Sequence, residues 1–108
     1  MRKFIIISSL FTCLYGKVRV VSSTSDIADI VKVIGGDNVT VTSIARGNQD
    51  PHYVEILPSY MVKVRKADIY FMVGMELDLW AQQIINGSRN QKVMVVDCSV
   101  EINKIKGI

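Results

Sequence analysis

The sequence predicts an α/β domain built on a parallel four-stranded sheet with flanking helices. Two observations support this prediction. Short Val- and Ile-rich runs typical of strands alternate along the chain with segments whose apolar residues recur at helical spacing. The helical segments lie between successive strands, as right-handed crossovers between parallel strands require. A chain of 108 residues suffices for one such domain.

The first half of the chain predicts a strand, a helix and a second strand. Residues 17–23 are short and Val-rich, as a strand should be. Ser25 and Asp26 can cap the helix that follows, and Gly35-Gly36 ends it. The inward face of this helix would hold Ile27, Ile30, Val31 and Ile34. Residues 38–44 alternate in polarity and predict the second strand.

The second half predicts two more helix and strand pairs. Pro58 can occupy the first turn of a short helix, and residues 68–74 are nearly all apolar, which is typical of a strand covered on both faces. A further helix is expected from Leu79 to Gly87, followed by a buried strand over 92–97. Ligands of such sheets gather at the carboxyl ends of the strands, where the longest loop, residues 45–57, would lie.

The amino terminus resembles a secretory signal. Arg2 and Lys3 precede an apolar run that is too short to span a bilayer but fits a signal h-region, so residues 1–16 are predicted to be a leader and 17–108 the exported domain. A buried first strand is the alternative interpretation of the same run. The segment ending at Cys13 also loosely matches a bacterial lipoprotein signal, which would make Cys13 a lipid-anchored N-terminus. The protein is then periplasmic or anchored at the cell surface.

Charge and motifs exclude several functions. The 13 basic and 10 acidic residues give +3, but removal of the leader leaves 11 and 10, and no basic cluster predicts a nucleic-acid partner. Neither GxGxxG, GxxxxGK[ST] nor GxSxG occurs, so no catalytic residue is assigned and the protein is expected not to be an enzyme. Cys13 and Cys98 are the two cysteines, and they predict no disulfide framework. Cys98 is expected to be a small buried residue at a strand end. The chain is expected to be a monomer.

The loop over residues 45–57 contains the only histidine of the chain, His52. Pro51 fixes its own φ and biases Asp50 toward an extended conformation, so His52 is presented from a stiffened support. A neutral imidazole held in this way suits Zn, Mn or Fe, with a carboxylate or carbonyl on its other nitrogen. A surface histidine in a turn is the alternative, because one histidine does not make a metal site.

From Val20 to Asp97 the sequence resembles the substrate-binding lipoproteins and periplasmic proteins of ABC importers for zinc and manganese. The resemblance rests on the order and spacing of short motifs: Gly47-Asn48-Gln49-Asp50-Pro51-His52, Pro58-Ser59, Lys66-Ala67-Asp68, and Gly74 through Leu77 with Trp80. It implies that the chain forms one lobe of a helical-backbone periplasmic binding protein, a fold in which a long helix joins two lobes. It further implies that His52 is a metal ligand, that Glu76 lies at the cleft rim, that Zn²⁺ or Mn²⁺ is the cargo, and that a membrane permease is the partner.

The resemblance ends before the remaining ligands and the second lobe, so the chain is expected to be an N-terminal lobe, either a fragment or a truncated product. Within it, only carboxyl groups, such as those of Asp50, Glu55 and Asp97, and the thiol of Cys98 could assist His52. The chain alone is therefore expected to bind Zn²⁺ or Mn²⁺ weakly or not at all. An exported adhesion or interaction module that has lost metal binding is the alternative function.

Aromatic residues elsewhere favour an ordinary hydrophobic core. Trp80, Tyr60, Tyr70 and Phe71 recur at helix-like or strand-like spacings. Core packing explains these spacings better than a ligand platform does.

Overall fold

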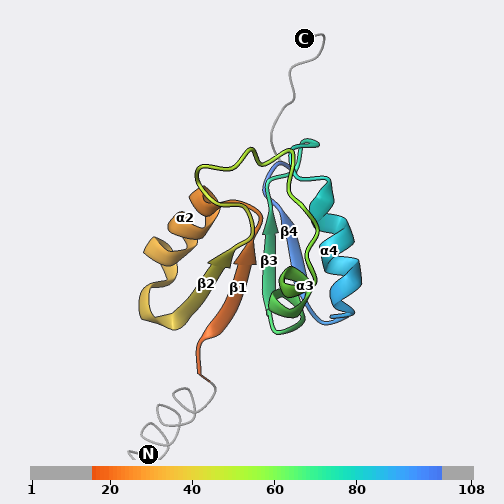
Figure 1. Cartoon of the computed structure of the whole chain (residues 1–108). Coiled ribbons are helices and arrows are strands. Elements are labelled where there is room, and N and C mark those ends of the chain that lie inside the picture. The colour runs from red at the N-terminus through yellow and green to blue at the C-terminus, as the bar shows by residue number, and fades with distance from the viewer. Residues whose placement is uncertain (1–15, 101–108) are drawn as a thin grey trace, which may run out of the picture.

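The computed structural model describes residues 16–100, which form one parallel sheet with helices on both faces (Figure 1). The predicted leader up to residue 15, with Cys13, and residues 101–108 lie outside the described residues. The elements, in chain order, are β1 (Val18–Ser22), α2 (Ser25–Gly35), the short 3-10 helix η1 (Gly36–Asn38), β2 (Val39–Ser43), α3 (Pro58–Arg65), β3 (Ile69–Met72), α4 (Trp80–Ser88) and β4 (Met94–Asp97).

The strand order is β2-β1-β3-β4, and every neighbouring pair is parallel. The chain winds outward in one direction from β1 to β2 and in the other from β2 to β3 and β4. Right-handed crossovers therefore place α2 on one face and α3 with α4 on the other. This confirms the predicted parallel four-stranded α/β lobe.

The core lies between the sheet and the helix pair α3 and α4. Val21 and Tyr70 are register partners on β1 and β3, so they point to the same face, where they join the buried residues Val64 of α3 and Ile84 of α4. Tyr70 is fully buried, its hydroxyl lies 2.8 Å from Ser23 Oγ, and burial raises the pKa of this phenol far above its usual range. The predicted core role of Tyr70 is confirmed.

Asn90 fastens the ends of the two core helices to each other. Its side-chain amide donates to the carbonyl oxygens of Val64 and Ala67, both at 2.9 Å, at the end of α3. Val64 is in the last turn of α3, and its carbonyl also accepts from the Ala67 backbone N–H at 3.0 Å, whereas Ala67 lies just beyond the helix, where carbonyls lack helical donors. The amide therefore satisfies the carboxyl end of α3 from the loop that follows α4.

Two predictions about burial are wrong. The helix α2 has no fully buried residue, and Ile30 and Ile34 of its predicted inward face are 59% and 81% exposed. The reason is that α2 lies over β1 and the edge strand β2, where a single helix is covered from one side only. The strand β4 is also not buried, because it forms the other edge, and Met94 is 61% exposed.

Within the described residues, no helix has the length and apolar character needed to cross a bilayer.

Candidate functional site

The connection between β2 and α3 passes over the carboxyl ends of the central strands (Figure 1). Both of its ends are anchored in the core, since Ala45 is 2% exposed and Val54 is 8% exposed. Between these anchors the chain is exposed and folds into turns. The site predicted from the sequence therefore lies at the edge of the sheet where parallel α/β folds bind ligands.

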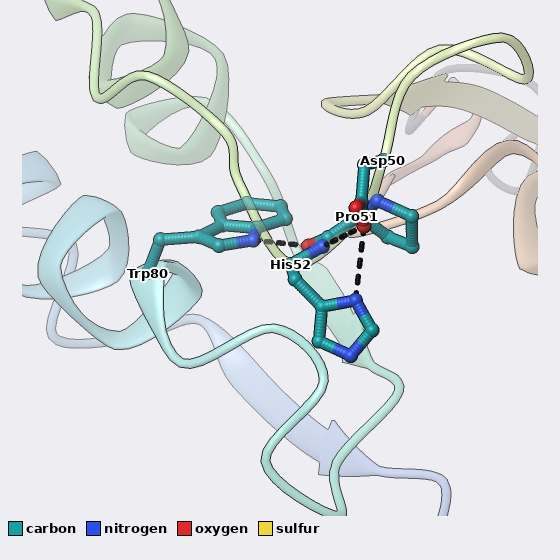
Figure 2. A network of polar contacts seen from close by, with 4 residues as sticks. All are labelled: Asp50, Pro51, His52 and Trp80. Atoms are coloured by element: carbon teal, nitrogen blue, oxygen red, sulfur yellow. Dashed lines mark hydrogen bonds and ion pairs between the residues drawn. The ribbon is translucent and has the colours of Figure 1, made fainter.

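Asp50, Pro51 and His52 form a compact turn at the middle of this connection (Figure 2). The backbone N–H of Tyr53 donates to the Asp50 carbonyl at 3.1 Å. One carboxyl oxygen of Asp50, Oδ1, accepts from the backbone N–H of His52 at 3.0 Å, which is the Asx-turn geometry that aspartate favours. The turn is therefore stabilised by its own first residue.

The same Oδ1 atom lies 2.9 Å from Nδ1 of the His52 ring. The hydrogen bonds from His52, first that of its backbone N–H and then that of its ring, hold the pKa of Asp50 below its ordinary value. An ionised carboxylate can only accept, so the proton of the neutral imidazole is on Nδ1. Nε2 is then left as the nitrogen with a free lone pair, on a side chain that is 56% exposed.

Trp80 holds the turn from the opposite side. Its indole N–H donates to the carbonyl oxygen of Pro51 at 2.6 Å, as Figure 2 shows. Trp80 is the first residue of α4, is 7% exposed, and belongs to the core cluster. Its predicted core role is confirmed, but the hydrogen bond to Pro51 was not foreseen. A buried indole N–H usually finds an acceptor, so the sequence does indicate that Trp80 needs a hydrogen-bond partner, although it does not identify that partner.

A hollow of about 280 Å³ lies under the connection, between the start of α2 and the carboxyl ends of the strands. Thr24, the residue before α2, and Ser25 and Asp26 at the start of α2 line one side of it, and Arg46 and Pro51 line it from the connection. His52 does not line this hollow, so its imidazole is presented to the outside rather than into the lobe.

The turn that follows β3 is the second feature at the end of the sheet where the carboxyl ends of the strands lie. Gly74, Met75 and Glu76 have successive positive φ values of 82°, 53° and 66°. The buried Asp78 supports the turn by accepting from the backbone N–H groups of Val73 at 2.8 Å and Gly74 at 3.0 Å. Glu76 is exposed there, at the carboxyl end of β3, and its assignment to a cleft rim remains a prediction.

Of the groups predicted to assist His52, only Asp50 contacts it. Across residues 16–100, no three histidine, cysteine, aspartate or glutamate side chains converge as a metal site would require. Glu55 is exposed in the connection, and Asp97 accepts from the Ser99 N–H and hydroxyl at 2.8 and 2.6 Å.

Cys98 is exposed, so its predicted burial is wrong. It lies just beyond the edge strand β4 and outside the core cluster. Partial desolvation and the negative charges of Asp97 and Asp78 still raise the pKa of the thiol. This opposes thiolate formation, which metal binding would need.

Comparison with known proteins identifies the family. The profile of the periplasmic zinc-uptake complex component A family matches residues 20–107. The manganese ABC transporter substrate-binding lipoprotein ScaA of Streptococcus gordonii is 34% identical over 98 residues, which cover 84% of this chain and 32% of ScaA. The chain belongs to this family of metal ABC transporter substrate-binding proteins. The periplasmic and lipoprotein relatives confirm the predicted extracytoplasmic location.

Solved structures show the same lobe. The Mn-bound periplasmic metal-binding protein of Candidatus Liberibacter asiaticus superimposes with a TM-score of 0.75 at 27% identity, covering 82% of this chain and 33% of that protein. The Zn(II)-bound ZnuA-like domain of AdcA from Streptococcus pneumoniae shares the fold, with a TM-score of 0.72 at 18% identity. The chain therefore spans about a third of the length of the relatives it matches.

Proposed function

We propose that this chain contributes His52 Nε2 as one ligand to an extracytoplasmic site that captures Zn²⁺ or Mn²⁺ for delivery to the permease of an ABC importer. The observation that carries the proposal is the Asp50–His52 pair. Its 2.9 Å contact fixes the ring through Nδ1 and leaves Nε2 exposed at the ligand-binding edge of the sheet. A carboxylate behind a histidine is the usual partner that orients a metal ligand and raises its basicity.

The family supports the choice of metal. Zinc appears in the family description, and manganese in the names of the streptococcal lipoprotein and of the Mn-bound neighbour. Imidazole suits both ions, and the identity of the preferred metal would follow from the ligands that complete the site. The role of the lobe is reversible binding, with no chemical step on the ion.

The remaining assignments follow from the same proposal. Residues 17–108 would be the N-terminal lobe of a two-lobed binding protein, and residues 1–16 its leader, with Cys13 as the lipid anchor if the leader is of the lipoprotein type. A second lobe would supply the further ligands, because a structural zinc site needs four ligands and an open one three. His52 and Asp50 provide one ligand and its orienting partner.

Calorimetric titration of the chain with Zn²⁺ and Mn²⁺ tests the proposal. We expect weak one-site binding that EDTA reverses, because the described residues assemble no cluster of three or more ligands. Mg²⁺, which prefers oxygen ligands, is the control and should give no comparable heat. Absence of any Zn²⁺ or Mn²⁺ binding, together with capture of a cell-surface protein that persists in EDTA, would instead favour the adhesion module.

A further inference from the structure

The turn that presents His52 has few attachments to the rest of the lobe. Apart from the hydrogen bond between Pro51 and Trp80, its hydrogen bonds are internal. Examples are Gln49 N–H to the Arg46 carbonyl at 3.0 Å and His52 N–H to Asp50 Oδ1. These internal bonds fix the conformation of residues 46–53 but not the position of this stretch relative to the sheet and helices. Among the described residues, the bond from the Trp80 indole to Pro51 is the hydrogen bond that joins this stretch to another element.

Trp80 is well suited to be a fixed point. Its side chain packs in the same buried cluster as Ile84 and Tyr70, which are fully buried, so the position of its Nε1 is set by the core. The acceptor, the Pro51 carbonyl, belongs to the residue directly before His52. At 2.6 Å the contact is short for an N–H donor. Displacement of the turn would therefore break a hydrogen bond that the core holds in place.

We infer that Trp80 is a positioning residue for metal capture, whose indole N–H holds the Asp50-Pro51-His52 turn so that Nε2 is already placed for the incoming ion. The inference rests on the proposed ligand role of His52. Two hydrogen bonds act in series: Trp80 places the backbone of the turn, and Asp50 then orients the ring. A ligand that is already in place loses less conformational entropy when it binds.

The variant Trp80→Phe tests this inference, because it keeps an aromatic ring in the core and removes the donor. The readout is the Zn²⁺ dissociation constant from NMR titration of the His52 ring signals. We expect a rise of about fivefold, corresponding to the loss of one hydrogen bond of roughly 1 kcal/mol. We also expect faster amide exchange at His52 and Tyr53, whose N–H groups stabilise the turn.

Tyr70→Phe is the matched control. It removes a different buried hydrogen bond of the same core, that between the Tyr70 hydroxyl and Ser23 Oγ, in which no residue of the connection takes part. It should lower stability without changing the Zn²⁺ dissociation constant. Equal dissociation constants in wild type and Trp80→Phe would overturn the inference, whereas absence of a His52 response in the wild type would overturn the proposed ligand role instead.

A measurement on the unmodified chain covers the case in which Trp80→Phe does not fold. Coupling between two events is reciprocal, so if the indole bond favours metal binding, metal binding must favour the indole bond by the same factor. The chain has one tryptophan, so its indole N–H signal is unambiguous. We expect saturating Zn²⁺ to slow exchange of this proton about fivefold. An unchanged exchange rate would contradict the inference.

Discussion

Replacing Asp78 with alanine should lower the free energy of unfolding by about 3 kcal/mol, because it leaves two inward-facing backbone donors without acceptors. The Asp78 side chain is almost fully buried and accepts from Val73 N–H and Gly74 N–H. Water cannot easily replace it, and Gly74 is itself buried in a turn of positive φ. Urea denaturation followed by circular dichroism measures the change.

Asp29→Ala is the control for the loss of a carboxyl group. Asp29 lies on the exposed side of α2, where removal of a carboxyl group should change the free energy of unfolding by less than about 0.5 kcal/mol. Asp78→Asn should fall between the two, since it keeps one acceptor oxygen. A loss below about 1 kcal/mol for Asp78→Ala would mean that the turn after β3 relaxes to find other acceptors.

The substitution His52→Ala should weaken Zn²⁺ binding by more than about tenfold, because loss of even an orienting partner behind a ligand costs 10- to 100-fold. The unfolding free energy should change little, since the ring is exposed and makes no contact with the core. Titration calorimetry and urea denaturation on the same preparation separate the two effects.

Asp37→Ala is the matched control for this experiment. Asp37 is an exposed carboxyl group in η1, at the end of α2 remote from the connection, and its removal should leave the affinity unchanged. If His52→Ala retained the wild-type affinity, the metal would be bound by other groups of the chain, and the role assigned to the turn would be wrong.

The succession of strands and helices along the chain and the parallel direction of the strands could be predicted from the sequence, because both depend on local patterns. Strand-like runs separated by helical segments require right-handed crossovers, and these fix a parallel sheet. The degree of burial could not be predicted in the same way. Ile34 and Met94 have the hydrophobicity of core residues, yet Ile34 lies on the helix over the edge strand β2 and Met94 on the other edge strand, β4, and edge position is a property of strand order.

In the candidate site, too, the local contact could be predicted from the sequence and the long-range contact could not. The support of His52 by Asp50 joins two residues that are two positions apart, and Asp50 is one of several groups that the sequence offers to assist His52. The bond from Trp80 to Pro51 joins residues 29 positions apart and exists only because α4 packs beside the connection. Periodicity identified Trp80 as a core residue but could not show which acceptor its indole N–H would meet.

The most direct test of the central claim is the ¹⁵N chemical shift of the two ring nitrogens of His52 during Zn²⁺ titration. The chain has one histidine, so the two signals need no further assignment to a residue. We predict that Nε2 shifts as it binds the ion, while Nδ1 stays protonated and bonded to Asp50. If Nε2 did not respond, or if Nδ1 lost its proton and bound the ion instead, the turn would not present the ligand proposed here.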